Sequence, residues 1–445
     1  MHIELPENVK YIIDELTSAG YEAYAVGGCV RDSVLGRKPK DWDITTSAEP
    51  LEVKKLFKRT IDTGIKHGTV TVMLKDEGYE VTTYRIDGEY SDHRRPETVE
   101  FTSNLSEDLR RRDFTINAMA YNEKDGLIDL YDGIGDIERH VIRCVGNPDE
   151  RFDEDALRIM RAVRFAAELD FEIDDATREA AAAHAPELSA VSAERIETEL
   201  TKLIMSDHPE KLMDAYHMGI TKMILPEFDR MAETPQNTPY HCYDVAGHTI
   251  EVIRAIPKTK VLRYTALLHD SGKPDCRTTD ESGRDHFKGH SAVSEQIAEQ
   301  VLRRLKMDND TISDVKKLVY WHDYGMKGDV KITTFRKGLS KMGIEYFDRF
   351  VEIKKADIAG QSDYGRQESL DNLAALIAMR DKVVADGDCL SIKELAVNGG
   401  DLKNLGIKPG PEMGEILKTL LGEVLGRPSM NTKEILMKRA SQLKK

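Results

Sequence analysis

Up to about residue 140, apolar and polar residues alternate in short runs that predict β-strands. Residues 69–74 and 80–85 alternate, residues 24–26 form a short apolar run before two glycines, and residues 41–44 carry a further strand pattern. A helical period covers residues 9–19 and ends at a glycine. Antiparallel strands with an early helix predict an α+β head.

Beyond about residue 150, the hydrophobic period becomes helical and stays helical to the end of the chain. Four parts are therefore expected: an α+β head with an antiparallel sheet (residues 1–145), an all-α neck and body (146–240), a further helical domain (241–365) and a helical tail (366–445). The predicted helices cover residues 153–169, 176–185, 193–205, 244–256, 291–306, 311–322 and 412–425.

Composition narrows the class of protein. The 445 residues are 40% hydrophobic and 32% charged, as in an ordinary folded domain. No apolar run approaches the roughly 20 residues of a membrane span, and the N-terminus lacks the pattern of a signal peptide. The five cysteines are scattered and odd in number, which favours a reduced, cytoplasmic chain without a Cys zinc site.

The net charge of −15 argues against non-specific binding of nucleic acids through a positively charged surface. Local basic clusters nevertheless occur. They are Arg94–Arg95, Arg110–Arg112, and the helical set Arg158, Arg161 and Arg164. If RNA is the partner, recognition of its shape at a defined site is expected.

Two carboxylates, Asp41 and Asp43, stand one residue apart on a predicted strand. Residues i and i+2 of a strand point to the same side, and paired carboxylates there suit Mg²⁺. Upstream, Gly27 and Gly28 let the backbone approach a phosphate closely, and Arg31 adds a cation. Alone, the Asp pair is more often a turn at a strand end; the combination predicts phosphoryl or nucleotidyl transfer.

A second polar cluster holds Arg111, Arg112, Asp113 and Asn117. The arginines only donate hydrogen bonds, the aspartate accepts them, and the asparagine does both. Such a set can hold a ribose hydroxyl and a triphosphate. The alternative is a helix start with surface arginines.

Asp155 and Arg158 are expected three residues apart on one helix face. Cytosine and adenine each present an amino donor beside a ring-nitrogen acceptor, which a carboxylate beside a guanidinium complements; uracil and guanine present the opposite pattern. The pair can therefore select C and A. The alternative is an ordinary intrahelical ion pair.

Together these motifs resemble the class II tRNA nucleotidyltransferases, the CCA-adding enzymes of the polymerase-beta-like superfamily. The matching pieces occur in the family's order, cover about residues 20–205 and are highly specific as a set. They are Gly27–Asp32, Asp41–Asp43, Arg111–Ala118, Glu154–Arg161 and Glu194–Glu199.

The resemblance implies a role for each matching residue. Asp41 and Asp43 would be catalytic and bind two Mg²⁺ ions, as in two-metal nucleotidyl transfer. Glu80 is the candidate third carboxylate. Asp155 and Arg158 would template the incoming base, with Glu194 and Arg195 bracing the template helix. The other expected nucleotide-binding residues are Gly27, Gly28, Arg31, Arg111, Arg112, Asp113, Asn117 and Arg161.

The activity that the resemblance implies is template-independent addition of CCA to tRNA 3′ ends from CTP and ATP. Residues 62–70 resemble the flexible element that full CCA- or A-adding enzymes use to change specificity, which disfavours CC-only addition. Residues 398–414 resemble the tRNA-gripping tail of the family. An A-adding-only enzyme and a poly(A) polymerase remain alternatives.

Histidines and aspartates form another pattern in the second half of the chain. His269-Asp270 is followed by Gly272-Lys273 and preceded, about twenty residues earlier, by His248. Imidazole and carboxylate ligands suit Zn, Mn, Fe or Ni, and distant helices can bring them together in a bundle core. A lone histidine is more often a satisfied core or surface residue.

This pattern resembles the HD phosphohydrolase superfamily and implies a second, metal-dependent phosphohydrolase activity. Lys273 would contact a phosphate, and His241 is expected at the surface. The implied ligands are His248, His269, Asp270 and Asp357 for one metal, with His290 and His322 as the extra ligands of a binuclear site.

The expected partners are tRNA, CTP and ATP, with no membrane and no DNA. Two readings from other classes remain open. In one, the HD domain is the principal activity and the head only binds RNA. In the other, the chain is a non-catalytic RNA-binding or scaffold protein.

Overall fold

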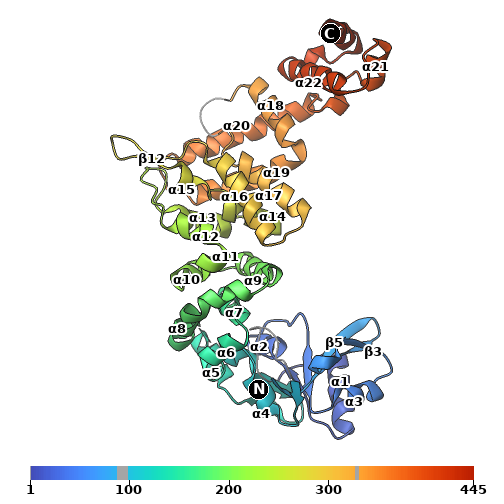
Figure 1. Ribbon diagram of the computed structural model, residues 1–445, viewed down its shortest axis with the longest axis vertical. Coiled ribbons are helices and arrows are strands. Elements are labelled where there is room, and N and C mark those ends of the chain that lie inside the picture. Colours follow the sequence, from blue (N-terminus) through green and yellow to red (C-terminus); the bar gives the residue numbers. More distant parts are fainter. Residues whose placement is uncertain (1, 88–98, 326–329, 445) are drawn as a thin grey trace. The chain divides into compact units, whose positions relative to one another are not determined.

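The computed structural model describes residues 2–87, 99–325 and 330–444. The chain forms two compact units, Met1–Asp229 and Arg230–Lys445 (Figure 1). The division into four parts stays a prediction. Arg94 and Arg95, expected in a basic cluster, lie outside the described residues.

A seven-stranded sheet forms the centre of the head, in the order β3-β4-β5-β2-β1-β8-β9. Neighbouring strands are antiparallel except for the pair β2–β5, which is parallel. The α+β head is thus confirmed, with one parallel pair inside its mainly antiparallel sheet. The strands are β1 (Ala23–Val26), β2 (Asp43–Thr46), β3 (Thr60–Gly64), β4 (Thr69–Leu74), β5 (Glu77–Thr83), β8 (Met119–Asn122) and β9 (Gly126–Asp129).

The sheet is covered by short amphipathic helices. On α1 (Glu7–Ser18), the buried residues recur at helical spacing, and the helix contacts β1. Tyr24 and Val26, two apart on β1, pack with Leu105 and Leu109 of α4 (Leu105–Arg110). Burial of this strand fixes the position of the Gly27–Gly28 turn that follows it.

The rest of the first unit is mainly helical, with two further strand pairs, β6 (Arg85–Asp87) with β7 (Val99–Phe101) and β10 (Val141–Ile142) with β11 (Glu172–Ile173). The predicted helix over residues 153–169 is wrong in one respect, because the chain forms two helices with a break at Asp155. Asp155 has extended backbone angles, and its carboxylate accepts the N–H of Leu157, which ends one helix and starts the next. The helices are α6 (Pro148–Glu154), α7 (Leu157–Leu169), α8 (Asp175–His184), α9 (Ala193–Met205), α10 (Lys211–His217) and α11 (Ile220–Ile224).

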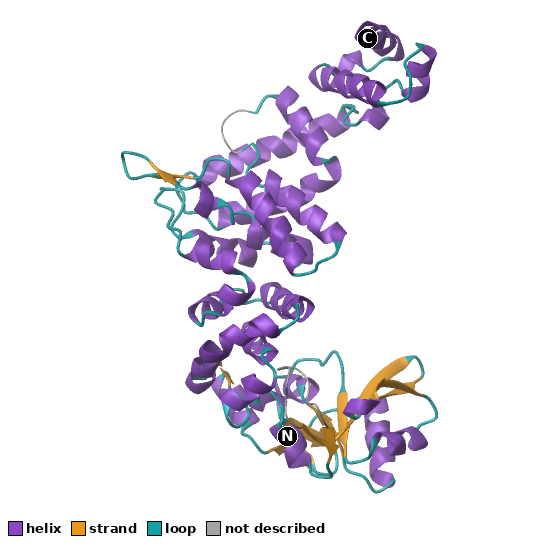
Figure 2. Cartoon of the chain, in the orientation of Figure 1, coloured by secondary structure: helices purple, strands orange, loops and turns teal. Residues whose placement is uncertain are grey.

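The second unit is helical apart from one short hairpin, β12 (Thr278–Thr279) and β13 (Asp285–His286), as Figure 2 shows. Side-chain caps fix several helix starts: Asp244, Thr259 and Asp308 each accept a backbone N–H three residues later. The main helices are α13 (Val245–Ala255), α14 (Lys260–Leu268), α16 (His290–Arg304), α17 (Asn309–Trp321), α18 (Ile332–Met342), α19 (Ile344–Ala359) and α20 (Arg366–Ala385).

The last helices have a hydrophobic core of their own, with Leu402, Leu420 and Leu436 fully buried in it. They are α21 (Gly399–Asn404), α22 (Pro411–Gly426) and α23 (Lys433–Leu443). Helix α20 packs with α18 and α19 in a shared core that includes Leu373 and Leu376. None of the helices in the described residues has the length and apolarity to cross a membrane.

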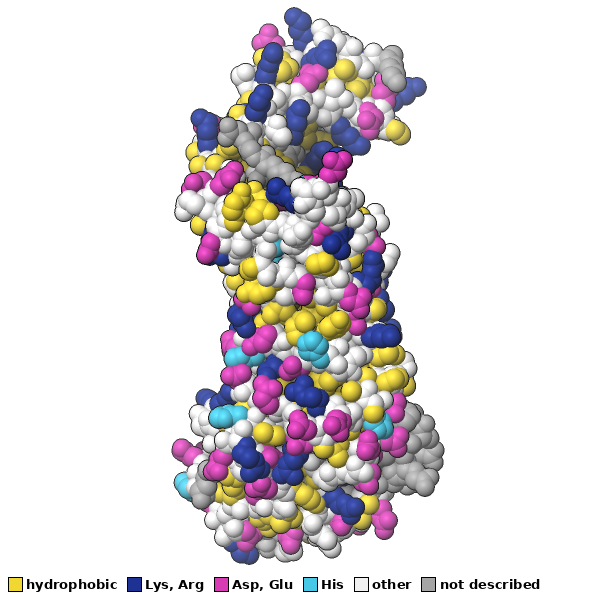
Figure 3. Space-filling view, turned by 90° about the vertical axis from the view of Figure 1, so that its left-hand side faces the viewer, with side chains coloured by type: hydrophobic (Ala, Val, Ile, Leu, Met, Phe, Trp, Pro, Cys, Tyr) yellow, Lys and Arg dark blue, Asp and Glu magenta, His cyan; other side chains and the backbone are white. Residues whose placement is uncertain are grey.

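Charges of both signs are interspersed over the face shown in Figure 3, without a continuous coat of Lys and Arg. This agrees with the net charge of −15. Binding of a polyanion by this chain therefore depends on local sites.

Candidate active sites

The parallel pairing of β2 with β5 brings two acidic residues together in the head. Ile44 pairs with Val81, so Asp43 and Glu80, the residues just before them, lie side by side. Both line a cavity of about 190 Å³, together with Arg111 and Arg112. Asp41 lies two residues before Asp43, the first residue of β2, and both aspartates are exposed at the start of the strand.

The electrostatics of this cavity favour a bound cation. Withdrawal from water raises the pKa of Asp43; Arg112 opposes the shift, and the charges of Glu80 and Asp41 add to it. A divalent cation would relieve this repulsion, and the all-oxygen donors fit Mg²⁺. Among the described residues, however, groups of three ligand atoms within 4.8 Å of one another occur only in the second unit, so the head carboxylates are spread more widely.

Gly27 lies beside Arg112, one of the arginines that line this cavity. Gly27 has φ 81°, and a Cβ there would lie only 3.0 Å from Nη1 of Arg112. The absence of a side chain thus lets the guanidinium pack against the backbone before α2 (Gly28–Val34). Arg31 donates from Nη1 to Oδ1 of Asn117 at 2.7 Å and from Nη2 to Oδ1 of Asp32 at 2.7 Å.

Asp113 is buried and uses both carboxylate oxygens inside the protein. Oδ2 accepts from Nε and Nη2 of Arg161 at 2.8 and 2.6 Å, and Oδ1 accepts from Nδ2 of Asn117 at 3.1 Å. Burial alone would raise the pKa of Asp113, but Arg161, Asn117 and Arg158 hold it well below the usual range. In this state Asp113 joins the head motif to α7.

Asp155 and Arg158 do not share one helix face, which corrects the expectation from their spacing. Asp155 lies in the break before α7, where Nη2 of Arg195 donates to its Oδ2 at 2.8 Å. Arg158 donates to Oε2 of Glu154 at 2.5 Å and to the carbonyl of Arg111 at 2.9 Å. Each residue of the pair is therefore held by other protein groups.

The sequence argument assigned no role of their own to two carboxylates, Asp108 of the head and Glu199 at the end of the Glu194–Glu199 motif on α9. Asp108 is fully buried and accepts from Nε and Nη2 of Arg111 at 3.0 and 2.7 Å and from the Thr45 hydroxyl at 3.1 Å. Glu199 accepts from the buried Arg164 of α7, whereas its motif neighbour Glu194 is exposed. The i, i+3 spacing of Asp108 and Arg111 was the available signal.

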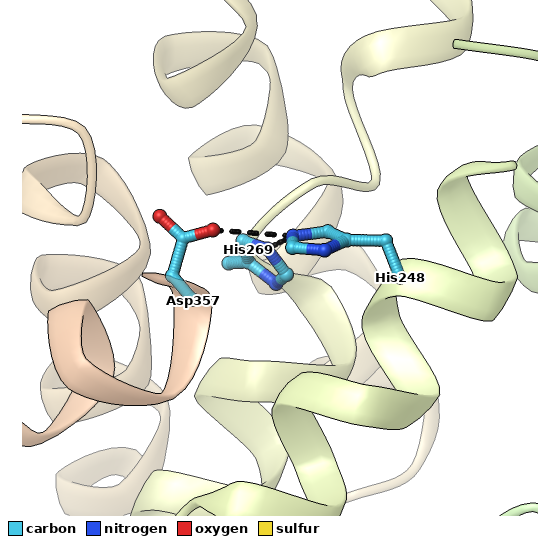
Figure 4. Close-up of side chains that lie close together, drawn as sticks. All are labelled: His248, His269 and Asp357. Atoms are coloured by element: carbon cyan, nitrogen blue, oxygen red, sulfur yellow. Dashed lines mark hydrogen bonds and ion pairs between the residues drawn. The ribbon is translucent and has the colours of Figure 1, made fainter. Parts of the chain in front are cut away.

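In the second unit, six predicted side chains from five helical segments converge. They form two groups whose ligand atoms lie within 4.8 Å of one another. Figure 4 shows the first group, in which Asp357 of α19 and His269 after α14 point at the ring of His248 on α13. The groups are His248, His269 and Asp357, and Asp270, His290 and His322.

Backbone carbonyls set the tautomer of all four histidines. Because a carbonyl only accepts hydrogen bonds, Nδ1 carries the proton and Nε2 presents a lone pair. The Nε2 atoms of His248 and His269 lie 3.4 Å apart, and those of His290 and His322 lie 3.1 Å apart. Nδ1 of His248 lies 3.1 Å from the carbonyl oxygen of Gly360, and Nδ1 of His269 lies 2.7 Å from that of Ala266. Nδ1 of His290 lies 2.8 Å from the carbonyl oxygen of Phe287, and Nδ1 of His322 lies 2.7 Å from that of Val319.

Facing lone pairs at these separations repel unless a cation lies between them. In addition, Oδ1 of Asp270 is buried without a hydrogen-bond donor among the described residues. Four imidazole nitrogens with two aspartates therefore fit one or two transition-metal ions such as Mn, Fe, Ni or Zn. The carbonyl contacts to Nδ1 are the orienting interactions that metal-binding histidines require.

A cavity of about 710 Å³ opens onto these ligands; we call it the histidine cavity, and its wall includes Asp270, Lys273, His290, His322 and Asp357. His241 also lines it, which corrects the expectation of a surface residue. Burial, and then the charge of Lys273, lower the pKa of His241 to about 3. Its ring lies 4.8 Å from that of His248.

The chain matches three family models along its length. Residues 23–143 match the poly A polymerase head domain, and residues 170–231 match the "probable RNA and SrmB-binding site of polymerase A". Residues 289–440 match domain 2 of tRNA nucleotidyltransferases.

Curated relatives extend this match over nearly the whole chain. The CCA-adding enzyme of Levilactobacillus brevis is 35% identical over 97% of this chain and 96% of its own length. The chain belongs to the CCA-adding enzymes. The family expected from the motifs is thus confirmed, and with it nucleotidyltransferase activity. The CCA-adding enzyme of Limosilactobacillus fermentum is 36% identical over 99% of this chain and 97% of its own.

Solved structures agree with this family. The Bacillus stearothermophilus CCA-adding enzyme in complex with CTP has a TM-score of 0.69 and 29% identity, over 97% of this chain and 95% of that one. The Thermotoga maritima enzyme complexed with tRNA has a TM-score of 0.63 at 20% identity and full coverage of both chains, which supports the shared fold.

Proposed function

We propose that this protein adds CCA to the 3′ end of tRNA from CTP and ATP. The observation that carries the proposal is 35% identity to a CCA-adding enzyme across nearly the whole of both chains. The complex of the Bacillus stearothermophilus relative with CTP supports the nucleotide substrate. The cavity that Asp43 and Glu80 share with two arginines supports the chemistry.

In this proposal Asp41 and Asp43 hold Mg²⁺, with Glu80 as a third carboxylate. The bound ions would supply charge stabilisation to an in-line nucleotidyl transfer. Gly27, Gly28, Arg31, Arg111 and Arg112 bind the triphosphate and ribose, and Asp113, Asn117 and Arg161 hold those groups in place, a network that the hydrogen bonds of Arg31 and Asp113 support.

Asp155 and Arg158 are proposed to select C and A. In the structure, Arg195 binds the carboxylate of Asp155, and Glu154 binds the guanidinium of Arg158. Base selection therefore requires these contacts to be exchanged for contacts with the base. We also propose that the four predicted parts divide the work: catalysis in the head, base selection in the neck and body, hydrolysis in the HD domain, and tRNA binding in the tail.

Nucleotide incorporation tests the first activity. Three tRNA transcripts, lacking CCA, ending in C and ending in CC, are incubated with Mg²⁺ and with CTP and ATP, singly and together. Extension of all three to CCA is expected. Extension of the CC-ending tRNA alone would indicate an A-adding enzyme, and long A tails would indicate a poly(A) polymerase.

Variants of the head make this test specific. Asp41→Ala is expected to abolish incorporation, because a metal ligand is lost. Asp76→Ala is the matched control, since Asp76 lies in the turn between β4 and β5. A fully active Asp41→Ala enzyme would contradict the assigned metal site.

A second activity, metal-dependent hydrolysis of a phosphoester, is proposed for the histidine cavity. The four inward Nε2 atoms and two buried aspartates favour it. The test is metal content and hydrolysis of a generic phosphodiester with Mn²⁺, Ni²⁺, Fe²⁺ or Zn²⁺, for the wild type and His269→Asn. Stoichiometric metal and hydrolysis that both depend on His269 are expected; absence of bound metal in the wild type would contradict the proposal.

These assays also distinguish the proposed CCA addition from the alternative in which the head only binds RNA. In that case hydrolysis would be present and incorporation absent from the wild type. A scaffold protein would show neither activity.

A further inference from the structure

Each of the two candidate metal-binding aspartates of the histidine cavity is paired with one buried lysine. Nζ of Lys273 lies 2.7 Å from Oδ2 of Asp270, and Nζ of Lys354 lies 2.7 Å from Oδ2 of Asp357. The two lysines are 6% and 2% exposed, and both line the cavity. Lys273 belongs to the His-Asp-x-Gly-Lys motif, whereas no motif of the sequence includes Lys354.

Further contacts differ between the two lysines. Lys273 also donates to Oε1 of Gln236 at 2.7 Å, so a neutral acceptor helps to hold it. Lys354 stands one helical turn before Asp357 on α19, and Asp357 is the carboxylate to which it donates. The other oxygen of Asp357 lies 3.1 Å from Nε2 of His248.

The charge balance of the cavity changes when these aspartates bind metal. With neutral histidines, the ammonium groups of Lys273 and Lys354 are balanced mainly by the carboxylates of Asp270 and Asp357, and Asp323 on the same wall adds to the charge that holds Lys354. Once Asp270 and Asp357 share their charge with divalent cations, both buried ammonium groups lose their contacting counter-charge, which is costly away from water. A metal-loaded site therefore needs an anion to compensate the two ammonium groups, and such an anion can enter through the open cavity.

We propose that Lys354 and Lys273 form a two-sided clamp for the phosphoryl group in the histidine cavity. Lys354 is the new member: it binds a phosphoryl oxygen after Asp357 has turned to the metal. The inference rests on the proposed metal-dependent hydrolase. His241 supports the location, since it lines the same cavity with a buried Nδ1 that lacks a hydrogen-bond partner among the described residues.

Inorganic phosphate is the probe, because it is the simplest ligand with phosphoryl oxygens. Its binding to the full-length protein is measured by calorimetry with and without Mn²⁺, and bound metal is counted separately. The wild type is expected to bind phosphate more tightly when loaded. Lys354→Met should weaken binding at least about tenfold, the loss of one charge-assisted hydrogen bond, while keeping its metal. Lys354→Arg should keep most of the affinity.

Lys355→Met is the matched control, because Lys355 is the next residue on α19, is exposed and contacts Glu352 at 3.0 Å. It should behave as the wild type. A wild type that binds no metal would overturn the hydrolase proposal itself. A loaded wild type that binds phosphate no better than the metal-free protein would overturn the clamp alone. So would a loaded Lys354→Met variant with unchanged phosphate affinity.

Discussion

At the scale of single residues, the arginine-rich motif of the head depends on buried carboxylates. Asp108 contacts Arg111 through two hydrogen bonds and lies 3.5 Å from Arg112. Burial alone would raise the pKa of Asp108, but the two arginines and the Thr45 hydroxyl lower it. The guanidinium groups of the cavity are therefore positioned by a residue that the substrate need not touch.

Asp108→Asn is expected to lower the free energy of unfolding by about 3 kcal/mol, since it removes the charge that compensates a partly buried arginine pair. The measurement is urea denaturation. Glu107→Gln, on the same helix, is the control and should change stability by less than about 0.5 kcal/mol. Equal stability of both variants would show that Asp108 does not hold the motif together.

The low pKa of Asp113 predicts that the free energy of unfolding depends on pH in the acidic range. Its pKa is lower in the folded than in the unfolded protein, where it is about 3.9, so its contribution is complete above that pH and is lost as the pH falls further. The free energy of unfolding should therefore fall below about pH 4, and less steeply in Asp113→Asn. Urea denaturation between neutral pH and pH 3 measures both slopes; parallel curves would contradict the pairing with Arg161.

At the scale of elements, the break between α6 and α7 gives Asp155 two roles. Its Oδ1 accepts the Leu157 N–H at 3.1 Å and so starts α7, and its Oδ2 binds Arg195. A residue inside a continuous helix would have had neither contact. The position proposed to read the base is therefore also a structural cap.

Two substitutions separate these roles. Asp155→Ala should remove the cap, at about 1 kcal/mol of stability, and also blur the choice between nucleotides while leaving some transfer. Asp155→Asn should keep the cap, because asparagine caps as well as aspartate, but lose the carboxylate that complements C and A. Thermal melting and misincorporation of UTP and GTP are measured; retained C/A selectivity in both variants would refute the templating role.

At the scale of the whole molecule, the chain carries two chemical sites in two compact units. As candidate metal ligands, the head cavity offers carboxylate oxygens only, and the histidine cavity offers imidazole nitrogens and carboxylate oxygens. Such donor sets prefer different metals. The two activities should thus respond separately to metal and to mutation.

Addition of Mn²⁺ should raise the melting temperature of the second unit. A ligand at 100 times its dissociation constant stabilises its site by about 2.7 kcal/mol. Scanning calorimetry of the wild type and His269→Asn measures the effect, which should be absent from the variant and reversed by a chelator. A shift of equal size in both proteins would place Mn²⁺ outside the histidine cavity.

The sequence predicted the helices around the histidine cavity well, because their signal is local. The His-Asp-x-Gly-Lys motif and the helices that carry His290 and His322 needed only spacing and period. The sequence did not predict features that depend on contacts between distant segments of the chain. The parallel pairing that places Glu80 beside Asp43, and the cavity wall that includes Lys354 and His241, arise from packing that one chain's pattern does not encode.

The carbonyls that orient the four histidines have a consequence for how this chain can evolve. Three of them belong to the residue three positions earlier, so these contacts use only the backbone of Ala266, Phe287 and Val319. A volume-conserving apolar exchange at the buried Ala266 or Val319 can therefore keep the contact. His248 is the exception: its carbonyl comes from Gly360, just after α19, where a Cβ would lie 3.2 Å from Nδ1. A larger residue at this glycine would press on the very imidazole that its carbonyl orients.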